Sequence, residues 1–136
     1  MKYLLDTNVI SDGRKAYQNP HVQEWFQNQE EESLYISALT VGEIVYGIEK
    51  LPPSDHKTSL SLWLSQTLLP GFCDRVLPVD EEVTQTWGRL RAQHRVVPAV
   101  DGLFAATAYT HSLVVVTRNT KDFHDLPVKT INPLAS

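Results

Sequence analysis

Acidic and amide side chains stand close to the ends of apolar runs that are typical of strands. Asp6 ends the first run, Glu43 lies one to two helical turns beyond the second, and Asp101 opens the helix before the most aliphatic run. Asn119 and Asp122 follow the end of that aliphatic run. Such oxygens are the ligands that Mg²⁺ or Mn²⁺ prefers, with the remaining positions filled by water and phosphate. An ion held in this way can activate water and stabilise charge that develops on a phosphodiester.

Each of these residues also has an ordinary local role open to it. Asp6 could cap the turn that follows, and Asp101 could be the N-cap of its helix. Glu43 could close a capping box with the threonine three residues before it. Asn119 could be a turn residue with positive φ, and Asp122 a surface charge or a cap. Only their joint placement at successive strand ends indicates a site.

Apolar runs that alternate with helical spacing predict the elements that position these residues. The expected strands are residues 2–5, 34–37, 75–79, 113–116 and 128–131. The expected helices are residues 21–29, 39–51, 55–68 with Asp55 as cap, a helix through 94 capped by Asp80, and 100–111, whereas 7–13 is expected to be a polar turn. Strands that alternate with helices indicate an α/β fold whose parallel sheet is covered on both faces. In open sheets of this kind, ligands bind at the carboxyl ends of the strands.

Length and composition are typical of one domain, residues 1–136. The chain has 136 residues with 42% hydrophobic and 21% charged side chains, which excludes a disordered chain. The single cysteine, Cys73, cannot form an internal disulfide and is expected to be a small buried side chain. No apolar run approaches the roughly 20 residues that cross a bilayer, and the N-terminus has no signal-peptide core. We therefore expect a cytoplasmic protein without membrane contact.

Charge is divided unevenly along the chain. Residues 1–85 carry 13 acidic and 6 basic side chains, whereas residues 86–136 carry 3 acidic and 6 basic ones. An acidic chain is not an obvious nucleic-acid binder, because phosphate contacts require Lys and Arg. The basic segment could supply a surface that faces phosphates, or it could be a solvated helix face.

Four stretches, and a fifth near the end of the chain, together resemble a known family. They are residues 3–11 (YLLDTNVIS), 37–47 (SALTVGEIVYG), 101–108 (DGLFAATA), 116–123 (VTRNTKDF) and 131–133 (INP). In this order and at these separations they resemble the PIN domain, and within it the VapC and FitB-like toxins of bacterial type II toxin–antitoxin pairs. The resemblance covers nearly the whole chain.

The resemblance implies a fold, an activity and a metal site. The fold would be a three-layer α/β/α sandwich around a mainly parallel sheet, and the activity Mg²⁺- or Mn²⁺-dependent cleavage of RNA. Asp6 and Asp101 match metal ligands of the family, and Glu43 matches the second acidic position. The fourth position, often Asp in the family, is Asn119 here, which leaves Asp122 as a candidate substitute.

Further residues and partners follow from the same resemblance. Thr7 and Thr117 match polar positions that line the site, and Arg118 and Lys121 flank it, where they could hold RNA phosphates or simply be exposed. Family members usually form homodimers. They are held inactive by a cognate antitoxin, VapB- or FitA-like, whose C-terminal segment runs into the active-site groove.

Four large apolar side chains could serve that dimer or antitoxin surface, or could belong to the core. They are Trp25, Phe26, Trp63 and Leu64.

Two other functions remain open from the residues. A PIN-fold binding module without catalysis is favoured only by Asn119. A receiver-like signalling domain would carry its reactive aspartate at the end of the middle strand, where this chain has Asp80, a residue expected to be a helix cap.

Overall fold

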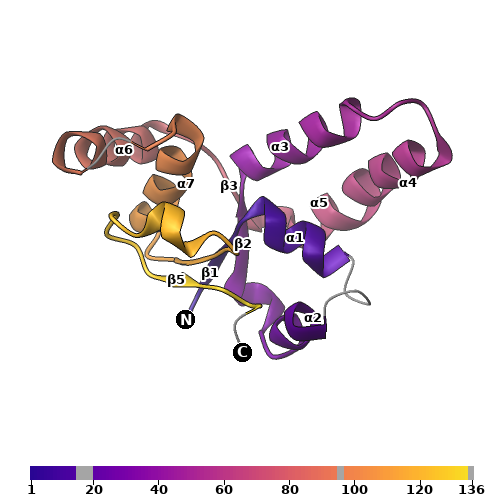
Figure 1. Ribbon diagram of the computed structural model, residues 1–136, viewed down its shortest axis with the longest axis horizontal. Coiled ribbons are helices and arrows are strands. Elements are labelled where there is room, and N and C mark those ends of the chain that lie inside the picture. The colour runs from indigo at the N-terminus through magenta and orange to yellow at the C-terminus, as the bar shows by residue number, and fades with distance from the viewer. Residues whose placement is uncertain (15–19, 95–96, 135–136) are drawn as a thin grey trace.

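In a computed structural model, the chain folds as a five-stranded parallel sheet between two layers of helices (Figure 1). The structure describes residues 1–14, 20–94 and 97–134. The strands are β1 (Tyr3–Leu5), β2 (Leu34–Ser37), β3 (Val76–Leu77), β4 (Val114–Val116) and β5 (Thr130–Ile131). Their order in the sheet is β3-β2-β1-β4-β5, and each neighbouring pair is parallel. The predicted three-layer α/β/α sandwich is therefore confirmed.

The helices divide between the two faces of the sheet. They are α1 (Thr7–Arg14), α2 (Pro20–Gln27), α3 (Ala38–Glu49), α4 (Asp55–Trp63), α5 (Leu69–Phe72), α6 (Glu81–Gln93) and α7 (Ala99–Thr110). Short turns of 3₁₀ or π helix are η2 (Glu31–Ser33), η3 (Leu64–Leu68), η4 (Cys73–Arg75) and η5 (Thr120–Phe123). In Figure 1, helices α1 to α5 lie on the right of the sheet, and α6 and α7 lie on the left.

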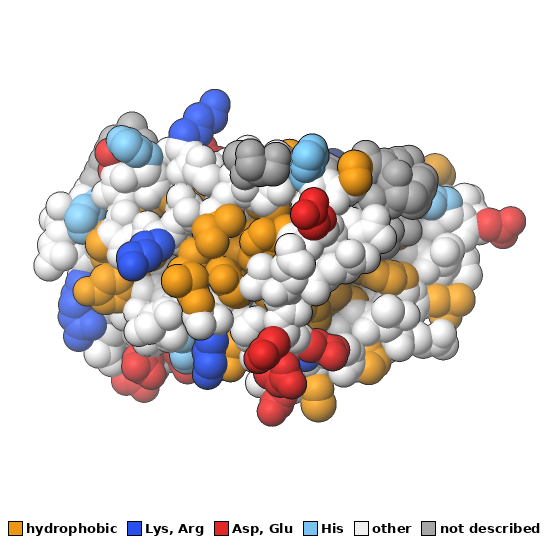
Figure 2. All heavy atoms as spheres, turned by 90° about the horizontal axis from the view of Figure 1, so that it is seen from below, with side chains coloured by type: hydrophobic (Ala, Val, Ile, Leu, Met, Phe, Trp, Pro, Cys, Tyr) orange, Lys and Arg blue, Asp and Glu red, His pale blue; other side chains and the backbone are white. Residues whose placement is uncertain are grey.

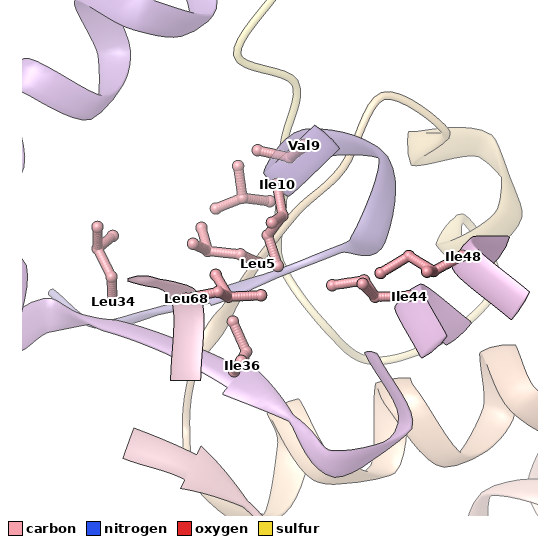
Figure 3. Close-up of a cluster of buried hydrophobic side chains, with 9 residues drawn as sticks. Leu5, Val9, Ile10, Leu34, Ile36, Ile44, Ile48 and Leu68 are labelled. Carbon is pink, nitrogen blue, oxygen red and sulfur yellow. The ribbon is translucent and has the colours of Figure 1, made fainter. Parts of the chain in front are cut away.

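The central strand β1 places its two leucines in different cores. Side chains on a strand alternate between the two faces of the sheet. Leu5 belongs to the cluster drawn in Figure 3, where it meets Ile36 of β2 and Ile44 of α3. Leu4 belongs to a second cluster with Phe104 of α7. Both leucines are fully buried, so β1 is held from both sides and the residue that follows it has a fixed position.

The register between β1 and β4 determines which residues meet at the carboxyl edge. Leu5 pairs with Val116, and the backbone N–H of Asp6 donates to the carbonyl of Val116 at 2.9 Å. Asp6 and Thr117 are therefore the next residues along two adjacent parallel strands, and they leave the sheet side by side. The first and fourth motifs are thus neighbours in space.

The turn expected at residues 7–13 is wrong, because this segment is helix α1. Its polar residues suggested a loop, but Val9 and Ile10 are buried in the first core cluster. The backbone N–H groups of Val9 and Ile10 also donate to the carbonyl of Asp6, at 3.1 and 3.2 Å. Burial of two apolar side chains outweighs the weak helix propensity of the residues around them.

The structure excludes one expected cap, Asp55, and two capping roles that the sequence left open, those of Glu43 and Asp101. Helix α4 is capped by Ser54, whose Oγ accepts from the N–H of Lys57 at 3.1 Å, and not by Asp55. Helix α3 is capped by Ser37, so Glu43 closes no capping box. The N-cap position of α7 is Pro98, and Asp101 lies inside the first turn. In each helix the true start lies one to three residues earlier than the acidic residue suggested.

The capping of α6 is confirmed. Asp80 is its N-cap, and its Oδ1 accepts from the N–H of Val83 at 3.0 Å. This role leaves Asp80 as a helix cap and not as the reactive aspartate that a receiver-like domain requires.

Two further expectations about side chains can be compared with the structure. Cys73 is exposed, so its expected burial is wrong. It lies between α5 and β3, as the first residue of η4, with φ of 40°. The four large apolar residues named above are half-buried and pack against the first core cluster, which favours the core role for them: Trp25, Phe26, Trp63 and Leu64.

Basic side chains gather on one half of the face drawn in Figure 2. Figure 2 shows the molecule from below, and most of the Lys and Arg side chains visible there lie on its left half. That half corresponds to the side of α6 and α7 in Figure 1. Among the described helices, none combines the length and apolar character needed to cross a membrane.

Candidate active site

Asp6 is held in one orientation at the carboxyl end of β1. Its Oδ1 accepts from the backbone N–H of Thr7 at 2.7 Å, and its Oδ2 accepts from Thr117 Oγ1 at 2.7 Å. The side-chain amide of Asn8 donates to the same Oδ2 at 3.4 Å. Donors on both oxygens leave the carboxylate little rotational freedom, which is the support that a metal-binding or catalytic carboxylate needs.

Glu43 is connected to the same strand end by a side chain. Thr7 Oγ1 donates to Glu43 Oε1 at 2.9 Å. Because Ser37 caps α3 directly after β2, Glu43 lies on the second turn of a helix that starts at the carboxyl edge of the sheet. The exposed Glu43 carboxylate is thus brought next to Asp6, although 36 residues separate Thr7 from Glu43 in the sequence.

The loop after β4 is tied into the same arrangement. Thr117 is fully buried, and its hydroxyl accepts from the backbone N–H of Asn119 at 3.0 Å while it donates to Asp6. The backbone N–H of Arg118 donates to Asn8 Oδ1 at 3.3 Å. The two threonines that the sequence assigned to the lining of the site therefore each hold one of its carboxylates.

Asp101 experiences the charges of all the other acidic residues of the predicted site. Burial raises the pKa of Asp101 above its ordinary value, and the negative charges of Asp122, Asp6 and Glu43 raise it further. Repulsion of this kind operates only over short distances, so four carboxylates from distant parts of the chain share one region. The charges that act on Asp101 support the predicted convergence of acidic residues, and the site itself stays a prediction.

Asp122 and Asn119, the two candidates for the fourth position of the site, have different surroundings in the structure. Of the three carboxylates that raise the pKa of Asp101, that of Asp122 acts most strongly. Asn119 is exposed, precedes η5 with φ of −103°, and contributes its backbone N–H to Thr117. Its backbone is therefore not in the positive-φ turn that the sequence left open. Arg118 and Lys121 are both exposed beside this loop.

Two hollows lie beside Glu43. One has a volume of about 330 Å³ between α1, α3 and α4, and the other a volume of about 580 Å³ between α3 and the start of α7. Thr7 and Glu43 line both. Sequence reasoning missed two lining residues of the larger hollow, Tyr46 and Val100; the only available signal was their spacing from Glu43 and Asp101.

The residues present fit a divalent cation bound through few direct contacts. In the ranges 1–14, 20–94 and 97–134, no three His, Cys, Asp or Glu side chains are close enough to grip one ion together. Mg²⁺ is usually bound through one or two carboxylates and several waters. Three other carboxylates act on Asp101, and their repulsion helps to raise its pKa. A divalent cation would bind favourably here, because its positive charge would offset that repulsion.

Comparison with known proteins places this site in a family. The sequence profile of the PIN domain matches residues 3–129. The chain is 39% identical over 134 residues to toxin FitB of Neisseria gonorrhoeae, with 96% of each chain covered. It is 37% identical over 134 residues to the VapC ribonuclease Y4jK of Sinorhizobium fredii, again with 96% of each covered.

A solved structure agrees with the sequence relatives. The crystal structure of FitAcB from Neisseria gonorrhoeae superposes with a TM-score of 0.91 at 37% identity, covering 98% of this chain and 99% of that one. The chain therefore belongs to the PIN domain family, where its relatives are the FitB and VapC toxins.

Proposed function

We propose that this protein is a Mg²⁺- or Mn²⁺-dependent endoribonuclease and the toxin of a toxin–antitoxin pair. The observation that supports the proposal most directly is electrostatic. The negative charges of Asp122, Asp6 and Glu43 all act on Asp101. The relative Y4jK is named a VapC ribonuclease, and FitB is named a toxin. Acidic clusters that bind a divalent ion are a common solution for hydrolysis of phosphodiesters.

The chain supplies the binding and orientation that this reaction needs. Asp6 and Asp101 would hold the ion, and Glu43 would reach it through a water molecule. A bound ion would lower the pKa of a water molecule and stabilise the charge that develops on the phosphate. Thr117 and Thr7 hold Asp6 and Glu43 in place by hydrogen bonds.

Cations beside the acidic cluster would hold the RNA backbone. Arg118 and Lys121 are exposed on the loop after β4, next to the carboxylates. Neighbouring phosphates of the substrate are negative and would be repelled by the acidic cluster alone, so flanking cations are needed to bind them. We assign this role to both residues.

The decisive test is cleavage of RNA by the purified protein in Mg²⁺, in Mn²⁺ and in EDTA. Cleavage should require a divalent ion, and Asp101→Asn should lower the rate by at least about 100-fold, the order expected when one electrostatic group is removed from a reaction site. Asp74→Asn, which changes an exposed carboxylate outside the cluster, is the matched control. Cleavage that persists in EDTA, or that survives Asp101→Asn unchanged, would overturn the metal assignment.

A non-catalytic binding module is the alternative that Asn119 suggested. It predicts RNA binding without cleavage under any of these conditions. The charge of Asp122 beside Asp101 favours the enzyme, because it supplies an acidic group where Asn119 does not.

We also infer a cognate antitoxin and a homodimer as partners. The inference comes from the likeness to FitB and to the FitAcB structure. Co-expression with the product of a short neighbouring gene should give a stable complex without RNase activity. Sedimentation of the free protein should give twice the monomer mass.

A further inference from the structure

Helix α3 presents one continuous stripe of residues to the larger hollow beside the acidic cluster. Leu39, Gly42, Glu43 and Tyr46 follow one another at spacings of three, one and three residues, so they share a face of the helix, and all four line the hollow. Lys50 continues the same stripe one turn further on. The stripe therefore leads from a site carboxylate, across an aromatic ring, to a cation.

The opposite wall of the hollow is apolar. Val79 follows β3 and Val100 lies beside Asp101 at the start of α7. Val100 is 45% exposed although it is a large hydrophobic side chain. A cavity with apolar walls and a few polar groups at one end is typical of a small-molecule or base-binding site.

Tyr46 is the most unusual residue of this hollow. It is 65% exposed, and its ring makes one described interaction, with the Lys50 ammonium at 5.1 Å from the ring centroid. A flat aromatic ring that is left uncovered beside a cation is a surface suited to stacking.

We propose that this hollow binds a nucleobase of the RNA substrate next to the cleaved phosphodiester, with Tyr46 stacked on the base. The proposal rests on the proposed ribonuclease function. Glu43 and Tyr46 are about one helical turn apart, roughly 5 Å, which is within the reach of one nucleotide. A phosphate at the acidic cluster thus places its own base, or the adjacent one, over Tyr46.

Charge distribution favours RNA over a protein at this position. A ligand that fits this stripe has an anionic group at the Glu43 end, where the metal ion is proposed, and a flat apolar group over Tyr46. A second anionic group would then lie near the Lys50 ammonium. A nucleotide carries these groups in this order, because phosphates lie on both sides of each base. An apolar protein surface would leave the exposed Glu43 carboxylate and the Lys50 ammonium without partners, at a cost.

The test compares three substitutions of Tyr46 with a matched tyrosine elsewhere. Tyr46→Ala removes the ring, whereas Tyr46→Phe and Tyr46→Trp keep a stacking surface. The control is Tyr109→Ala: Tyr109 is 53% exposed but lines a separate hollow with Met1 and Lys129. Binding of a short single-stranded RNA of mixed sequence is measured by fluorescence anisotropy in EDTA, and cleavage of the same RNA is measured in Mg²⁺.

We expect Tyr46→Ala to weaken RNA binding and raise KM by at least about fivefold, since stacking of one base on an aromatic side chain has an effect of this size or larger. Tyr46→Phe, Tyr46→Trp and Tyr109→Ala should stay within about twofold of the wild type. Inorganic polyphosphate, which has charge but no bases, should bind the wild type and Tyr46→Ala equally.

Three results would overturn the stacking role. The first is unchanged RNA binding by Tyr46→Ala, and the second is an equal loss of polyphosphate binding. The third is a change of sedimentation mass on Tyr46→Ala, which would make this face a contact between protein copies. Failure of the ribonuclease itself is distinguishable, because it would appear as absence of cleavage by the wild type in Mg²⁺, whereas the stacking role is read from binding in EDTA.

Discussion

At the scale of single residues, the site depends on hydroxyl groups as much as on carboxylates. Thr117 is buried and donates to Asp6 at 2.7 Å, and Thr7 donates to Glu43 at 2.9 Å. Negatively charged carboxylates repel one another. The hydrogen bond from each threonine holds one carboxylate in place against that repulsion. In the proposed reaction, both threonines would act through Asp6 and Glu43, as positioning residues.

Thr117→Val removes the hydroxyl and keeps the side-chain shape. We expect RNA cleavage to fall by about 10- to 100-fold, the range typical when a partner of a metal-binding side chain is removed. Thr7→Val should act in the same direction through Glu43. The control is Thr110→Val, which removes a hydroxyl that donates to Thr86 at 2.8 Å outside the site and should keep full activity. Equal activity of all three variants would contradict the positioning role, provided that circular dichroism shows each to be folded.

Asp122 and Asn119 can be separated by the same assay. Because the Asp122 carboxylate acts most strongly among the charges on Asp101, we expect Asp122→Asn to lower cleavage more than Asn119→Ala does. The second variant keeps the backbone N–H that donates to Thr117, so it should have a small effect. The opposite order would identify Asn119 as the fourth site residue.

At the scale of elements, the pair α6 and α7 positions Asp101 through one close contact. A Cβ added at Gly102, the residue after Asp101, would lie 3.0 Å from Nε1 of Trp87 and 3.2 Å from its Cδ1. The Arg91 guanidinium also lies over the indole of Trp87, 4.5 Å from the ring centroid. The first turn of α7 therefore rests against the Trp87 ring, and this contact requires glycine.

Two glycine substitutions should have opposite effects. Gly88→Ala lies on α6 where a Cβ meets nothing within 4 Å, so it should raise the free energy of unfolding by about 0.5–1 kcal/mol through helix propensity. Gly102→Ala should lower it by about 1–3 kcal/mol, because the methyl group displaces Trp87. Urea unfolding of both variants gives the two values. Gly102→Ala should also reduce cleavage, since Asp101 moves with its turn. An unfolding free energy of Gly102→Ala equal to or above that of the wild type would refute the contact argument.

At the scale of the whole molecule, folding gathers negative charge that the unfolded chain keeps apart. The folded protein holds the Asp101 proton more tightly than the unfolded chain does, because burial and the other carboxylates raise its pKa. In the absence of a divalent ion, this group therefore contributes less stability as the pH rises from the ordinary carboxyl pKa through the raised value. The site is built at the expense of stability.

Asp101→Asn should accordingly raise the Tm at neutral pH in EDTA, because it removes one charge from the cluster. Mg²⁺ should raise the Tm of the wild type, since a ligand that binds only the folded state stabilises it, and should raise that of Asp101→Asn less. Differential scanning fluorimetry over a Mg²⁺ titration measures both effects. A lower Tm for Asp101→Asn in EDTA would show that the carboxylate stabilises the fold and that the repulsion argument is wrong.

The alternation of apolar runs and helical spacing was sufficient for the architecture. Residues 34–37 form a strand with the predicted bounds, Asp80 caps its helix, and the parallel sheet follows from the order of strands and helices. These features depend on local patterns that repeat within a few residues. Helix α1 was missed because its evidence, the burial of Val9 and Ile10 against β1 and α3, depends on contacts with residues far away in the chain.

The types of residue in the site could be read from the chain, since acidic groups after apolar runs are visible without coordinates. Which of these residues interact in the folded protein could not be predicted from the sequence. The register of β1 against β4, the hydroxyl of Thr7 reaching Glu43, and the charge of Asp122 on Asp101 are long-range relations. Local propensity acts over a few residues, whereas the distance between Asp6 and Asp101 depends on how the sheet and both helical layers pack. That packing also left Tyr46 uncovered beside Glu43, which no pattern in the amino-acid order foretells.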